Sequence, residues 1–356
     1  MNTFTKLTGI VIFSIMGFAS CGREAVEPLP VIPPSDGSKL TLNGGEGGSD
    51  AANAVYVDLS TDKQSAVARD SWSLGFYSGS EFRVIINNQV GYSAKATDIT
   101  DIKDVNSTNF DISELAHSTS ALGLIKNYDD TLGRIDKTVI SEIKENTSDN
   151  KVYVINTVNG GTVDKANVWK VKINRGSNEE YVLQYAKIDD SSAQTITIKK
   201  DPSLNFNFIS FNKGPVNVEP AKDEWDFVWN KSMFFTFMGT TAVPYLFSDL
   251  VFINHLNGVS ASEIIFLDSN GKSNGNPSYE EFDTSKIANV KFNNSRNVMA
   301  SSWRNTLAGG VLKDRYYVIK DKQGNIYKLK FLVMGVKDDG GKRGYPELEY
   351  KLVKGN

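Results

Sequence analysis

The chain has 356 residues, 23% of them charged, and a formal net charge of −3. This length is enough for two small domains, and the nearly balanced charge offers no broad basic field, so we expect no nucleic-acid partner. Aromatic residues make up 11% of the chain, and with 29 Gly they favour many strands separated by turns.

The first twenty residues have the pattern of an export signal. Lys6 gives a positive start, and residues 7–18 form an apolar stretch too short to cross a bilayer. Small residues then precede Cys21, which is the only cysteine in the chain. We therefore predict a lipoprotein signal peptide over 1–20, export through the general secretory route and lipidation of Cys21. The alternative is a secreted protein with a free thiol.

A spacer follows the predicted lipid anchor. Residues 21–50 contain four prolines between 28 and 34 and then four glycines between 44 and 48. This composition predicts a flexible tether. The glycines lack the spacing of a phosphate-binding loop.

Short strand-like runs, rich in β-branched and aromatic residues, occupy much of the chain from residue 54 onward. The clearest in the first half are 55–59, 72–77, 82–86, 152–155, 168–173, 181–185 and 195–198. The stretch 99–145 differs, because its apolar residues recur loosely at helical spacing, and it predicts one or two helices.

The chain contains an internal repeat. The strand 56–59 and the following Trp72 parallel the strand 208–211 and the following Trp225, at offsets of 152 and 153. A later hairpin, 169–185, parallels 316–331. The same order at nearly constant offset predicts two related β units, 51–200 and 201–356. They would form either two domains or one continuous sandwich, if residues 205–208 pair with strands of the first unit.

Catalytic motifs are scarce. The chain has two histidines and no GxSxG, HExxH or CxxC pattern. His117 lies beside three hydroxyl residues and reads as a surface histidine. The acidic turn that begins at Asp268 lacks the final Glu of a calcium loop. We therefore predict no enzyme, no catalytic residues and no metal site formed by protein side chains alone.

One passage of the second unit, residues 225–252, is unusually aromatic. Alternation places Trp229, Lys231 and Met233 on one face of a strand and Asn230 and Ser232 on the other. The aromatic residues continue beyond them on both faces. Such a strand is buried between layers, covered by a partner, or lines an apolar ligand cavity.

Three framework stretches carry a resemblance to a known family. They are residues 56–60, 69–77 and 81–87, which read YVDLS, RDSWSLGFY and EFRVIIN, and they resemble the HmuY family of Bacteroidetes lipoproteins. Residues 208–227, 325–331 and 345–350 fit as well, so the resemblance covers nearly all of the mature chain. It implies an all-β, HmuY-like β-sandwich, here built from two related units with a small helical insertion near 99–145.

The resemblance also implies a function. Members are lipid-anchored at the outer membrane or cell surface, bind haem and pass it to a TonB-dependent outer-membrane receptor. Their axial ligands are His in some members and Met in others. A known member has a His shortly after the Trp-Asp strand, where this chain has Asn230. The nearby Met233 and Met238, with His255 farther along, are therefore the candidate axial ligands.

Two other functions stay open at the level of sequence. A member of this family without haem binding would recognise a glycan or a partner protein at the cell surface. A β-sandwich hydrolase would need two facing carboxylates in a cleft.

Overall fold

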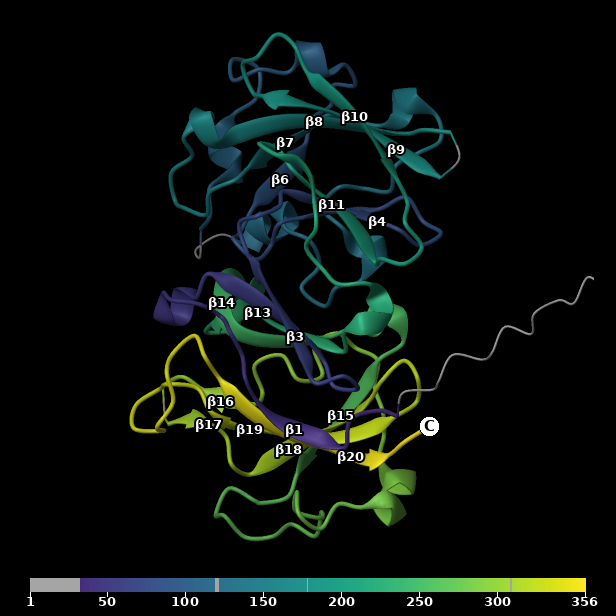
Figure 1. The fold of residues 1–356 in the computed structure, drawn as a ribbon. Helices are drawn as coiled ribbons and strands as arrows, with labels where there is room; N and C mark the ends of the chain where they lie inside the picture. The colour runs from purple at the N-terminus through teal and green to yellow at the C-terminus, as the bar shows by residue number, and fades with distance from the viewer. Residues whose placement is uncertain (1–32, 119–121, 178, 308) are drawn as a thin grey trace, which may run out of the picture. The chain divides into compact units, whose positions relative to one another are not determined.

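The computed structural model describes residues 33–118, 122–177, 179–307 and 309–356 (Figure 1). The predicted signal peptide and Cys21 lie outside these residues. The described chain consists of antiparallel strands and 3-10 helices, which confirms the all-β fold class. None of its helices is long and apolar enough to cross a membrane.

The first pair of sheets packs around one apolar core. A five-stranded sheet has the order β10-β9-β8-β7-β6, and a four-stranded sheet has the order β12-β11-β4-β5. The strands are β4 (Leu74–Tyr77), β5 (Val84–Ile86), β6 (Ser93–Ala96), β7 (Tyr153–Asn156), β8 (Val168–Arg175), β9 (Glu180–Lys187), β10 (Gln194–Lys199), β11 (Phe206–Ser210) and β12 (Gly214–Val216). Trp169, Val171 and Ile173 alternate along β8 and meet Phe76 of the facing sheet in this core.

The second pair of sheets repeats this arrangement. One sheet has the order β1-β20-β19-β18-β15 and the other β14-β13-β2-β3. The strands are β1 (Gly37–Thr41), β2 (Asn53–Asp58), β3 (Lys63–Ala68), β13 (Phe227–Met238), β14 (Thr241–Ile253), β15 (Ser260–Ile265), β18 (Arg315–Lys320), β19 (Ile326–Val333) and β20 (Glu347–Lys354), with a small β16 (Arg304–Asn305) and β17 (Gly310–Val311) ribbon beside them. Tyr327, Leu329 and Phe331 alternate along β19 into a core shared with Phe227 of β13.

Strands are exchanged between the two repeats. β2 pairs with β13, which follows Trp225, while β11 pairs with β4, which follows Trp72. The first strand of each repeat thus pairs with the strand that follows the repeated tryptophan of the other. Residues 206–209 thus pair with a strand of the first predicted unit. The unit bounds 51–200 and 201–356 remain a prediction.

Every helix in the described part of the stretch 99–145, which omits 119–121, is a short 3-10 helix. They are η2 (Ile102–Asp104), η3 (Ile112–Leu115), η4 (Leu122–Asn127) and η5 (Ile135–Lys137). Asp101 and Asp111 cap the first two by accepting hydrogen bonds from backbone N–H groups two residues later. Ile102 and Leu115 are buried against β7 and β8. The spacing of apolar residues, which predicted one or two helices, arises because these residues anchor an irregular segment to the sheet.

The structure shortens the predicted tether. Residues 37–41 form β1, which pairs with β20, and Leu42 is fully buried in the second core. Gly44 packs against the indole ring of Trp229, where any side chain would collide. Residues 37–44 therefore belong to the folded unit because they complete a sheet edge and cover its core.

Candidate functional site

The hairpin of β13 and β14 is longer than the sheet to which it belongs. β13 pairs with β2 only from Phe227 to Trp229, whereas its pairing with β14 continues to Met238. Beyond Trp229 the hairpin is thus a ribbon without β2 as a third strand. Such a ribbon needs other cover for its apolar side chains.

An irregularity divides the hairpin. Asn230 faces Leu250 and Ser232 faces Phe247, so β14 has one more residue than β13 between these pairs. Asp249 takes up the extra residue with a φ of 56°, and its buried carboxylate forms an ion pair with Arg343. The bulge separates an inner half, fixed in the core, from an outer half.

The outer half of the hairpin, residues 234–247, exposes large apolar side chains. We call it the hairpin end. Phe237, Met238 and Tyr245 are 62%, 60% and 49% exposed. The rings of Phe235 and Phe237 meet edge to face at 5.6 Å, and those of Tyr245 and Phe247 at 5.0 Å. A cluster of exposed aromatic residues is typical of a binding surface.

The three candidate axial ligands from the sequence lie in three different surroundings. Met238 is exposed beside the hairpin turn, across from Thr241. Met233 is buried at 1% exposure, and its backbone N–H donates to the carbonyl of Asn88. His255 lies in η9 (His255–Asn257), where Nε2 is 3.2 Å from the carbonyl oxygen of Gly133. Met238 therefore has the accessible sulfur, while the other two have protein neighbours.

His117 is held by two hydrogen-bond contacts, although its sequence setting suggested a plain surface residue. Its Nδ1 is 3.1 Å from the hydroxyl of Tyr128, and its backbone N–H donates to the carbonyl of Gly160. Partial burial lowers the pKa of the imidazole, which favours the neutral form that binds metals. The helix η4, between His117 and Tyr128 in the chain, packs against β14. This segment is thus a neighbour of the hairpin.

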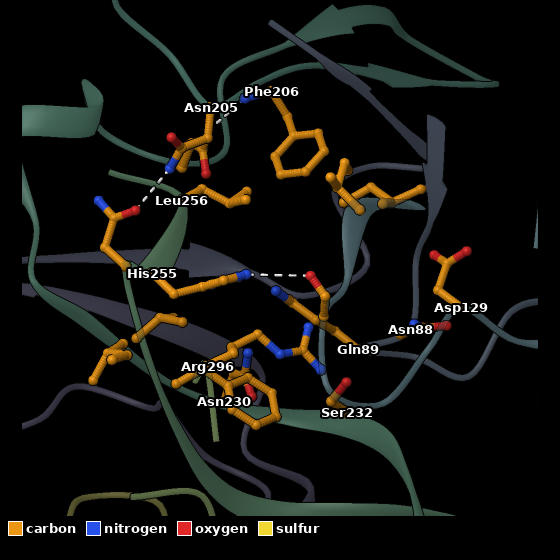
Figure 2. Close-up of a pocket in the computed structure, with 18 of the residues that line it drawn as sticks. Asn88, Gln89, Asp129, Asn205, Phe206, Asn230, Ser232, His255, Leu256 and Arg296 are labelled. Atoms are coloured by element: carbon orange, nitrogen blue, oxygen red, sulfur yellow. Dashed lines mark hydrogen bonds between the residues drawn. The ribbon is translucent and has the colours of Figure 1, made fainter. Parts of the chain in front are cut away.

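A cavity of about 150 Å³ is lined by residues of both four-stranded sheets, on the sheet faces that point away from the two main cores. Two aromatic pairs line this cavity, and each joins a tryptophan of one repeat to the first strand of the other. Trp72 meets Phe208 edge to face at 4.9 Å, and Trp225 meets Tyr56 in the same way at 5.1 Å. The polar side of the cavity includes Arg296, Asn230, Ser232, Gln89 and Asn88 (Figure 2).

Three ionisable groups of the cavity are shifted toward their neutral forms. Burial raises the pKa of Glu219 to about 8 and that of Asp129 to about 7. Asp129 is held by the backbone N–H groups of Ile86 and Val139, at 2.9 and 2.8 Å. Burial lowers the pKa of His255 to about 4, so this imidazole is uncharged at neutral pH.

The cavity and the hairpin end differ in their fit to a large ligand. Ligand pockets usually measure about 300–1,000 Å³, so a cavity of about 150 Å³ is too small for haem. The hairpin end presents the exposed side chains of Phe237, Met238 and Tyr245 to solvent. Within the described residues, no cluster of three or more His, Cys, Asp or Glu could hold a metal ion.

Sequence reasoning missed most of the cavity. Arg296, Asp129 and Glu219 come from segments far apart in the chain and share no motif. His117 had a weak signal, as one of only two histidines, but its contact with Tyr128 depends on the folding of residues 112–128.

Comparison with known proteins gives one result. A family model described as HmuY protein matches residues 50–350. No curated protein and no solved structure shows a significant match to this chain.

Proposed function

Because this chain belongs to the HmuY family, which is non-enzymatic and whose members are haem-binding proteins of haem uptake, we propose that it binds haem and passes it to an outer-membrane receptor. The match over residues 50–350 carries this proposal. Family membership also removes the hydrolase alternative.

The hairpin end is the proposed haem site. Porphyrin is a large flat apolar ring, and Phe237 and Tyr245 offer exposed aromatic surface for it to stack on. Met238 lies beside them with its thioether exposed, and thioethers are established haem ligands. When bound, haem would supply iron for coordination, and the chain would supply the apolar surface and the axial side chains.

We assign Met238 and His117 as the axial candidates to test first. The hydroxyl of Tyr128 contacts Nδ1 of His117, which leaves Nε2 as the nitrogen for iron. A second hydrogen bond of this kind orients most metal-binding histidines. Met233 and His255, which the sequence also suggested, are buried or bonded to a backbone carbonyl, so they rank behind.

The proposed cellular location rests on the predicted lipoprotein signal at the N-terminus and on the family to which the chain belongs. HmuY proteins are surface lipoproteins. Lipidation of Cys21 would anchor the chain to the outer membrane, and residues 22–36 would separate the anchor from β1. The hairpin end would then be free to meet a TonB-dependent receptor that accepts the haem.

Titration with haemin tests the proposal. The mature chain should give a saturable, shifted Soret band at micromolar protein. Met238→Leu and His117→Leu should each change the coordination spectrum. Tyr128→Phe should lower haem affinity by about tenfold or more, because it frees the imidazole to rotate.

Met233, which is buried, and His255, which contacts a backbone carbonyl, provide matched controls. Met233→Leu keeps its volume, and His255→Gln keeps a polar group near Gly133. Both should leave the haem spectrum unchanged. A change confined to these two variants would reject Met238 and His117 as the ligands. A flat titration of the wild type would favour the second candidate, in which the exposed aromatic residues recognise a glycan or partner protein.

A further inference from the structure

One edge of the hairpin end has backbone groups that face away from the sheet. A two-residue turn, Gly239–Thr240, joins β13 to β14, and Met238 and Thr241 close it. A pair that closes such a turn exchanges two backbone hydrogen bonds, and the direction of bonding alternates along an antiparallel strand. Phe235 and Phe237 therefore direct their backbone N–H and C=O groups away from β14.

Met233 shows where these outward groups have a partner and where they do not. Its backbone N–H, which has the same direction as those of Phe235 and Phe237, donates to the carbonyl of Asn88 at 2.8 Å. Pairing of β13 with β2 has already ended at Trp229. Among the described residues, the outward backbone groups of Phe235 and Phe237 have no hydrogen-bond partner. An edge strand with unpaired groups can pair with another strand.

The opposite edge of the same ribbon is protected against such pairing. Pro244 of β14 lies across from Phe235, so the position without an N–H is on the outer edge of β14. Helix η4 packs against this strand. Prolines, charged side chains and covering segments are the means by which proteins block exposed edges. The β13 edge, residues 232–238, contains neither a proline nor a charged residue. The contrast indicates that this edge is left open for a second strand.

The β13 edge is complementary to itself. In an antiparallel pair of two copies, the outward groups meet when Phe235 lies opposite Phe237 of the second copy, and Thr236 then lies opposite Thr236 of the second copy on the twofold axis. Each Phe235–Phe237 pair would exchange two backbone hydrogen bonds. Aromatic pairs and Thr–Thr pairs stabilise neighbouring strands, and no charged residue between 232 and 247 opposes the approach. The edge therefore suits a second copy of this chain.

We propose that the β13 edge of the hairpin end pairs with the same edge of a second copy, so that the two hairpins form one continuous antiparallel sheet with twofold symmetry. Strand addition of this kind uses main-chain hydrogen bonds at the edge and leaves the two faces of the ribbon open. The haem proposal uses the side chains on those faces. Dimer formation therefore needs no haem, and it stands or fails separately from haem binding.

Sedimentation velocity of the mature chain without haem tests the pairing, with Cys21→Ser to exclude a disulfide between copies. The contact is small, so we expect a reversible dimer with a dissociation constant on the order of 10 μM. Thr236→Lys and Thr236→Glu should each weaken the dimer about fivefold or more, because like charges then face each other on the twofold axis. An equal mixture of the two variants should restore the dimer, since opposite charges meet there.

Thr240→Lys is the matched control, because it places the same charge at the exposed turn, outside the paired residues. It should change the dissociation constant less than about twofold. If the charged variants of Thr236 do not fold, Phe235→Pro provides the second variant. It removes an outward N–H without removing a bond to β14, and it should abolish the dimer. A wild type that stays monomeric up to about 200 μM, a dimer insensitive to Thr236→Lys, or a mixture that stays as weak as its components would overturn the proposal whatever the haemin titration shows.

Discussion

The inner and outer halves of the β13–β14 hairpin are both rich in apolar residues, but the fold buries only the inner half. From Phe227 to Met233 the side chains of β13 are mostly buried, because β2 and two packed sheets surround them. From Phe234 to Met238 exposure increases toward the turn, although the residues are just as apolar. The comparison shows that apolar sequence alone does not place a residue in the core. Where the fold gives no cover, a ligand or partner is the expected cover.

The largest expected effect is in the inner half. Phe227 is fully buried in the second core, and Phe227→Ala should lower the free energy of unfolding by about 3–5 kcal/mol. Denaturant unfolding followed by tryptophan fluorescence measures this. A loss below about 1 kcal/mol would mean that the inner half is not the anchored part of the hairpin.

Next in size is a substitution in the segment that covers the inner half. A Cβ on Gly44 would collide with the ring of Trp229 and with the carbonyl of Gly344. Gly44→Ala should therefore cost about 1–3 kcal/mol of unfolding free energy. Gly239→Ala at the hairpin turn is the comparison, because nothing lies within 4 Å of a Cβ there and only its φ of 65° opposes the change. Equal, negligible costs would show that residues 37–44 are tether after all.

The cavity beside the inner half gives stability a pH dependence. Glu219 has a pKa of about 8 in the folded chain, above its ordinary value, so the folded state binds more protons between these two values. The free energy of unfolding should thus fall as pH rises from about 5 to about 8. Glu219→Gln should reduce this fall by up to about 4 kcal/mol over the interval, because each pH unit at which the two states differ by one proton changes the free energy by about 1.4 kcal/mol. A steeper slope in Glu219→Gln would contradict the assignment.

The smallest effect belongs to the outer half. Phe237 is 62% exposed, so Phe237→Ala should change unfolding free energy by less than about 0.5 kcal/mol. Phe227→Ala and Phe237→Ala remove the same atoms, so the difference between their effects on stability would come from the burial of the two side chains. Substantial destabilisation by Phe237→Ala would place the hairpin end in a core rather than at a binding surface.

Sequence patterns predicted the sheets better than the sites. Alternation in residues 168–173 and 326–331 indicated strands, and the tryptophan offsets indicated a repeat, because both signals are local or periodic. The exchange of β2 and β11 could not be read from them, since either pairing buries the same residues. The cavity around Arg296 was equally hidden, because it depends on how distant segments meet.

The aromatic passage shows the same limit within one element. Its alternation left three settings open for the strand, and near Trp229 and Met233 the side chains are buried. It did not indicate that burial ends beyond Met233, because that depends on where β2 stops pairing. Met238 could thus be suggested as a ligand from its residue type, but its exposure needed the structure.

The most direct test compares haemin titrations of the wild type and a variant that removes the apolar surface of the hairpin end, Phe237→Ala, Met238→Ala and Tyr245→Ala together. All three side chains are at least 49% exposed, so the variant should fold with nearly unchanged stability. We expect a saturable Soret shift in the wild type and its loss in the variant. A Soret shift of equal affinity in both proteins would contradict the assignment of haem to the hairpin end.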